Sequence, residues 1–144
     1  MTKLLGSLAL AAFAAAMTTP TLKADSYLCL MGNNVMSGTY VMSGTGNIVG
    51  LGPVVMAGEV VYNGDGTGVL MSATKNVNGA VVRVSMVPAT FTVNPDCTGS
   101  KIVGTGSSAT HFDFLITPDG STITWVETDA NVVISGKAVR IGFK

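Results

Sequence analysis

The chain has 144 residues with eight basic and eight acidic side chains, so its formal net charge at pH 7 is zero. No basic patch of the kind that binds nucleic acids or anionic membranes is present, and we expect neither partner. Two cysteines and one histidine do not make a four-ligand zinc site, and the chain has no Walker loop or nucleophile elbow. We therefore predict no metal and no cofactor.

Residues 1–24 have the features of a secretory signal peptide. Lys3 supplies a positive charge near the start, and a run of apolar and small residues follows over 4–16. This run is shorter than the ~20 residues that a membrane-spanning helix needs, so we expect no membrane span in the mature chain. Cleavage after Ala24 leaves residues 25–144 as a single domain, and cleavage after Ala16 fits the small-residue rule better. Either site predicts a secreted or periplasmic protein.

Cys29 and Cys97 are the two cysteines of the chain. Two cysteines in an exported protein usually form one disulfide, and this one would tie the start of the mature chain to a turn at residues 94–99. Closing a loop of that length stabilises a fold by roughly 4 kcal/mol in the chain-entropy model.

Short runs rich in Val and Ile follow along the chain, and 18 glycines punctuate the sequence. With no helical period, this pattern predicts an all-β domain of short strands and tight turns. We expect strands near residues 37–43, 54–62, 67–74, 80–86, 89–93, 101–105, 110–117, 121–128 and 132–140. Residues 44–53 carry four glycines and few charges, which predicts a mobile connection or a bulged strand.

Turn chemistry is clear at four places. Residues 63–66, 78–79 and 118–120 predict hairpin turns, and the Asn-Pro-Asp segment at 94–96 predicts another tight turn. Eight or nine strands joined mostly by hairpins predict an antiparallel up-and-down meander, and closing it into a barrel removes the exposed edges. An outer-membrane barrel is an alternative, but the mature chain has few aromatic residues and rather short strands for that class.

Several segments form a familiar pattern: Asn-Pro-Asp-Cys-Thr-Gly-Ser at 94–100, Phe-Asp-Phe-Leu-Ile at 112–116, Trp-Val-Glu-Thr-Asp at 125–129, Ser-Gly-Thr-Tyr at 37–40 and Gly-Asp-Gly at 64–66. The pattern resembles small exported proteins with an allene-oxide-cyclase-like barrel. This resemblance implies a closed eight-stranded antiparallel barrel of the calycin or lipocalin-like kind. It also implies an isomerase or cyclase that holds a flexible apolar substrate, although no catalytic motif of those enzymes transfers to this chain.

Glu59, Arg83 and Glu127 are charged residues within apolar strands. Side chains alternate across a strand, so each points either to water or into the barrel. An inward Arg83 would neutralise one carboxylate while the other keeps a raised pKa, which suits a general acid or base. Glu127 shares a strand face with Trp125, so it is our candidate catalytic residue. The alternative for all three is an outward, solubilising position.

Three methionines and four aromatic residues on strands are the candidates for an apolar pocket, because flexible thioethers and large rings can line a ligand cavity. They are Met56, Met71, Met86, Tyr62, Phe112, Phe114 and Trp125. We expect the barrel to bind a small apolar molecule in its interior. An isomerase or cyclase is the first alternative, and a structural or interaction protein with a filled core is the second. The identity of the ligand and the oligomeric state stay open.

Overall fold

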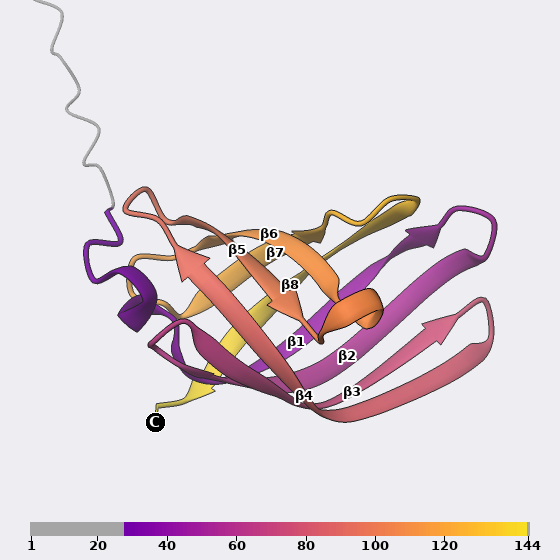
Figure 1. The fold of residues 1–144 in the computed structure, drawn as a ribbon, viewed down its shortest axis with the longest axis horizontal. Helices are drawn as coiled ribbons and strands as arrows, with labels where there is room; N and C mark the ends of the chain where they lie inside the picture. The colour runs from indigo at the N-terminus through magenta and orange to yellow at the C-terminus, as the bar shows by residue number, and fades with distance from the viewer. Residues whose placement is uncertain (1–27, 144) are drawn as a thin grey trace, which may run out of the picture.

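The computed structural model describes residues 28–143, and the expected signal peptide at 1–24 lies outside them. The strands are β1 (Ser37–Ile48), β2 (Gly52–Asn63), β3 (Thr67–Val77), β4 (Ala80–Val93), β5 (Thr98–Val103), β6 (Thr110–Ile116), β7 (Thr122–Glu127) and β8 (Val132–Gly142). Each strand pairs antiparallel with the next, and β8 pairs with β1 (Figure 1). The expected closed, up-and-down barrel of eight strands is confirmed. Within 28–143, no helix is long and apolar enough to cross a membrane.

Two expectations about the strands are wrong. Residues 80–86 and 89–93 form one strand, β4, in which Pro88 pairs with Val69. Pro88 lies next to a bulge, where a strand tolerates a residue without an N–H. Residues 44–48 are neither a mobile connection nor a bulge, because they continue β1 in unbroken register with both β2 and β8. The chain turns at 49–51 instead.

The bulge lies at Met71 of β3 and Met86 of β4. Leu70 pairs with Val87 and Ser72 pairs with Ser85, so the register leaves out both methionines. Met86 has a φ of 56°, in the left-handed region that bulges and tight bends use. Met71 is the extra residue of β3, because the register between β2 and β3 shifts between Glu59 and Val60. The pairs of β3 with β4 keep the same offset on both sides of the unpaired methionines. Residues that line the interior cavity are three positions apart on either side of them, Leu70 and Ala73 in β3 and Val84 and Val87 in β4. Both methionines consequently point outward, with 36% and 65% of their surface exposed.

Three turns at one end of the barrel, which we call the closed end, share one hydrogen-bonding pattern. They join β2 to β3, β4 to β5 and β6 to β7, and their central residues are Asp65, Asp96 and Asp119. Each aspartate accepts, through Oδ1, the backbone N–H two residues further on, at 2.8 to 3.0 Å. The residue in between has a positive φ and is Gly66, Cys97 or Gly120. These Asx turns fix the directions of six strand ends.

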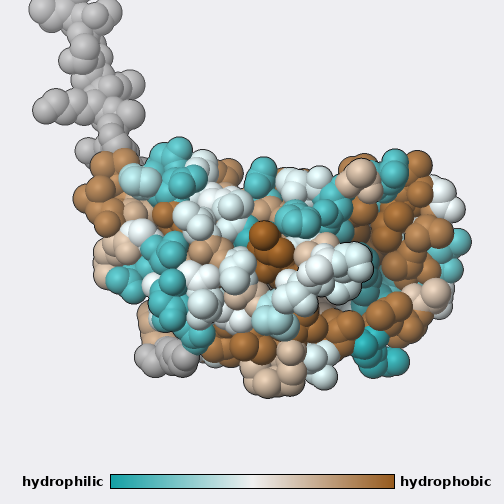
Figure 2. All heavy atoms as spheres, viewed as in Figure 1, coloured by the Kyte–Doolittle hydropathy of each residue, from teal (hydrophilic) through white to brown (hydrophobic). Residues whose placement is uncertain are grey.

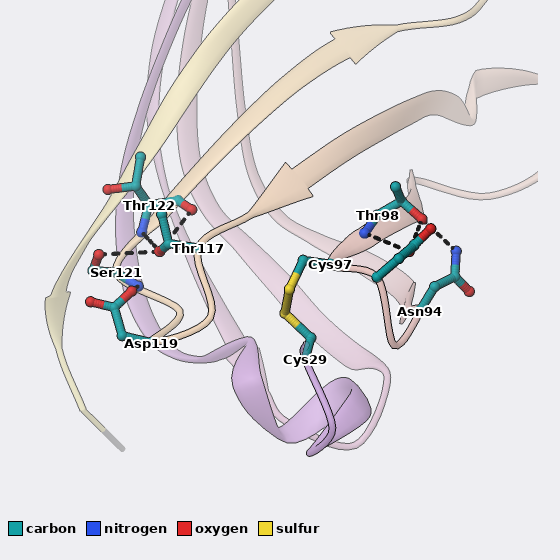
Figure 3. The surroundings of a disulfide bond; sticks show 9 residues. Cys29, Asn94, Cys97, Thr98, Thr117, Asp119, Ser121 and Thr122 are labelled. Carbon is teal, nitrogen blue, oxygen red and sulfur yellow. Dashed lines mark hydrogen bonds between the residues drawn. A yellow bond between two sulfur atoms is a disulfide. The ribbon is translucent and has the colours of Figure 1, made fainter. Parts of the chain in front are cut away.

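The predicted disulfide between Cys29 and Cys97 is confirmed, and it covers the closed end (Figure 3). The N–H of Cys29 also donates to the carbonyl of Pro95 at 2.8 Å. Together they hold the single turn η1 (Gly32–Val35) over the barrel opening, and Met36 behind it is fully buried. Disulfides are typical of oxidising, extracellular environments.

Aromatic rings fill the barrel behind η1. Tyr40, Tyr62 and Phe91 pack edge to face, with centroid distances of 5.5 and 5.2 Å. The hydroxyl of Tyr40 donates to the Gly120 carbonyl at 2.6 Å and accepts two hydrogen bonds from the Arg140 guanidinium, at 2.9 and 3.1 Å. The closed end is therefore both packed and hydrogen-bonded.

Glycines in the barrel wall make room for the largest rings. Trp125 faces Gly136 of β8, and Phe114 faces Gly99 of β5. A Cβ atom on either glycine would overlap with atoms of the facing ring. Pairing an aromatic ring with a cross-strand glycine covers the backbone that the glycine leaves bare.

Candidate functional site

The opposite end of the barrel, which we call the open end, is hollow. A cavity of about 280 Å³ lies there, close to the lower limit of the roughly 300–1,000 Å³ that is usual for ligand pockets. Apolar side chains form most of its wall: Met42, Met56, Val60, Leu70, Ala73, Val82, Val84, Val87, Val103 and Phe112. The interior is thus packed at the closed end and hollow at the open end.

The free edge of β4 forms one side of the entrance. β4 pairs with β5 only through residues 89–93, so no strand among residues 28–143 pairs with the outer edge of 80–87. Val82 and Val84 on this segment line the cavity and are exposed. Gly104 and Ser108 of the β5–β6 connection line the cavity as well. The cavity therefore opens sideways between β4 and that connection, and apolar residues also gather on the surface at this end of the molecule (Figure 2).

Lys101 of β5 points into the cavity and is only 3% exposed. Its Nζ donates to the hydroxyl of Tyr62 at 3.3 Å and lies 4.7 Å from the centroid of the Phe112 ring. No carboxylate within the described part of the chain forms an ion pair with it. Burial lowers the pKa of Lys101 to about 8, because the aromatic face attracts the charged amine but does not replace its water.

Glu127 of β7 is the second buried ionisable group of the cavity, with 7% of its surface exposed. Lys101 pairs with Phe112 and Phe112 pairs with Glu127, so the three form one inward-facing row across β5, β6 and β7. Burial raises the pKa of Glu127, and Lys75, whose Nζ lies 4.0 Å from Oε2, opposes that shift. Such a carboxyl group keeps its proton to a higher pH than an exposed glutamate does.

The predicted ligand-contacting residues divide into three groups. Met56, Tyr62 and Phe112 line the cavity. Met71 and Met86 do not, because the bulge turns them outward. Phe114 and Trp125 are buried but do not line it, because their rings pack over the glycines of the barrel wall.

Of the three charged residues predicted within apolar strands, Glu127 is the buried one. Arg83 is exposed and Glu59 is half-buried, so Arg83 does not neutralise a buried carboxylate as the inward alternative required. The cation beside the buried carboxylate of Glu127 is instead Lys75 of β3. The sequence pattern singles out neither Lys75 nor Lys101. The available signal for Lys101 is its alternation with Ser100 and Ile102, which puts it on the face of the buried Gly99.

A second hollow of about 580 Å³ lies on the outer face of β5 to β8. Its wall includes the outward-facing residues Ser100, Leu115, Thr124 and Val126, and Asp113 is its one ionisable side chain. We favour the interior cavity as the functional site, because it combines an apolar wall with two buried ionisable groups.

Comparison of the chain with protein-family models, with curated proteins and with solved structures gave no match.

Proposed function

We propose that this protein is exported and binds a small, mainly apolar molecule inside the barrel. The observation that carries the proposal is the cavity of about 280 Å³ at the open end, with its wall of methionine, valine and leucine side chains. Apolar walls of this kind favour apolar ligands because binding removes both surfaces from water.

The gap beside β4 gives such a ligand a route into the cavity. Because residues 80–87 lack a partner strand on one side within the described structure, no ladder of hydrogen bonds between strands closes this gap. Each buried methylene contributes about 0.8 kcal/mol, so an eight-carbon chain gains roughly 6 kcal/mol before the entropic cost of binding. This gain favours ligands with a short alkyl chain.

Titration with 1-octanol, followed by calorimetry and by the fluorescence of the single tryptophan, tests the proposal. Ala73 is buried in the cavity wall, so Ala73→Phe should fill the cavity and weaken binding at least tenfold. Thr74→Phe is the matched control, because the neighbouring side chain is exposed and outside the cavity. Equal binding by both variants and the wild type, or no binding by the wild type, contradicts the proposal.

An isomerase or cyclase of the allene-oxide-cyclase-like type is the second candidate. The resemblance implies it, and Glu127 favours it, because a carboxyl group with a raised pKa in an apolar cavity can move a proton on a bound substrate. Substrate and product of an isomerase have the same mass, so chromatography has to separate them. If Glu127 is the acid or base, Glu127→Gln purified from its own host should hold a different isomer from the one that the wild type holds. The same compound in both proteins contradicts catalysis by Glu127.

A further inference from the structure

Lys101 is an unusual group for an apolar cavity, because its amine is buried and no carboxylate in the described part of the chain forms an ion pair with it. Besides its own amine, the cavity wall carries the phenol of Tyr62 from β2 and two side chains of opposite charge, Lys75 from β3 and Glu127 from β7. Glu127 is the one carboxylate among them, and it is the partner of Lys75. Among residues 28–143, Lys101 therefore has only the neutral hydroxyl of Tyr62 as a hydrogen-bond acceptor.

This environment favours the uncharged amine. A buried ammonium group without a carboxylate loses the hydration that stabilises its charge, and its pKa falls to about 8. At neutral pH, Lys101 then exists as the free amine roughly two hundred times more often than an exposed lysine, whose pKa is about 10.4. A desolvated lysine of this kind is an activated nucleophile toward carbonyl compounds.

We propose that Lys101 forms a reversible Schiff base with an apolar aldehyde that enters the cavity. The Nζ lone pair attacks the carbonyl carbon, forming a C–N bond, while the C=O double bond becomes single and one amine proton moves to the oxygen, which becomes a hydroxyl group. The nitrogen then gives up its second proton as the C–O bond breaks and the hydroxyl leaves as water, which gives a C=N bond. One amine and one aldehyde thus become one imine and one water, with no oxidant or reductant.

The row of side chains across the cavity wall also provides an acid for the loss of water. Lys101 and Glu127 are two strand positions apart, about 10 Å between backbones at the usual strand spacing, with Phe112 between them. Both side chains point into the cavity. An aldehyde bound at Lys101 therefore lies in the same cavity as the Glu127 carboxyl group, which can donate a proton to the departing hydroxyl group. Phe112 forms the apolar surface beneath it.

The inference depends on the proposed function, since the aldehyde has to occupy the same cavity. A pair of ligands separates the two. Octan-1-ol tests occupation of the cavity, and octanal has the same chain length but also carries the reactive carbonyl group. The full mature protein is incubated with octanal and sodium cyanoborohydride at neutral pH, and the modified lysines are identified by peptide mass spectrometry.

We expect one reduced adduct, on Lys101, to form at least ten times faster than any adduct on the exposed Lys137. Lys101→Met should lose the fast adduct, whereas Lys137→Met should keep it, and circular dichroism checks that both variants fold. If octanol binds but octanal modifies the lysines evenly, the Schiff base is wrong and the proposed binding function stands. If neither ligand binds, both proposals are wrong.

Discussion

The closed and open ends of the barrel consist of the same eight strands and differ in what lies between them. At the closed end, η1 and the disulfide cover a packed group of aromatic rings, and three Asx turns fix the strand ends. At the open end, long hairpins surround a cavity, β4 has a free edge, and two ionisable groups are buried. The contrast indicates that one end contributes most of the stability and leaves the other free to keep features that cost stability.

The largest expected effect comes from breaking the cover of the closed end. Replacing both cysteines with serine removes a cross-link between residues 68 positions apart. We expect the free energy of unfolding to fall by about 4 kcal/mol, because the unfolded chain regains the entropy of an open loop. Urea denaturation of the wild type and the double variant measures the difference. A loss below about 1 kcal/mol would mean that the closed end does not depend on this bond.

A second variant tests the packing of the rings against the barrel wall. Gly136→Ala would place a methyl group against the ring of Trp125 and the carbonyl of Ser43, so we expect a loss of about 3 kcal/mol from overpacking. Gly142→Ala is the matched control on the same strand, because the nearest atom to its added carbon is 4.0 Å away, in Thr39. Equal thermal midpoints for the two variants would contradict the close packing of Trp125.

At the open end we expect a substitution, Lys101→Met, to increase the stability of the protein. The folded-state pKa of Lys101 is about 8, below its unfolded value of 10.5, so folding disfavours the charged amine. At pH 7 the wild type bears this penalty, about 3 kcal/mol at 1.36 kcal/mol per unit, and the hydrogen bond to Tyr62 returns about 1 kcal/mol. Lys101→Met should therefore raise the free energy of unfolding by about 2 kcal/mol at pH 7.

The pH dependence of that difference in stability tests whether folding lowers the pKa of Lys101. Between pH 8 and 10.5 the unfolded wild type binds a proton that the folded protein has lost, so wild-type stability rises with pH in this window. The advantage of Lys101→Met should shrink as the pH rises through the same window. Denaturation curves at several pH values measure it. If Lys101→Met is less stable than the wild type at pH 7, Lys101 stabilises the fold, and the expected stability cost of burying its amine is wrong.

The closed end is also the part that the sequence predicts best. Turn residues such as Asn94, Asp96 and Gly120 act through local backbone chemistry, which can be recognised without knowing the fold. The disulfide follows from the cysteine count and the expected export. Strand pairing then follows from hairpin order, which is why the barrel itself is predictable.

The open end depends on non-local details that the sequence does not reveal. The bulge at Met71 and Met86 shifts the alternation in the middle of two strands, and no Gly marks it. Lys101 lies in a strand of six residues with an outward isoleucine beside it, so polarity gives no indication of its direction. Whether Trp125 faces a cavity or a packed wall depends on Gly136, which lies eleven residues away in the chain.

The contrast between a packed and a hollow end is tested most directly by methyl NMR during a titration with octan-1-ol. We expect shifts at the methyl groups of Met42, Met56 and Leu70, which line the interior cavity, and none at Leu115 or Val126 on the outer hollow. Shifts confined to Leu115 and Val126, or no shifts at ligand concentrations where octanol stays dissolved, would contradict it.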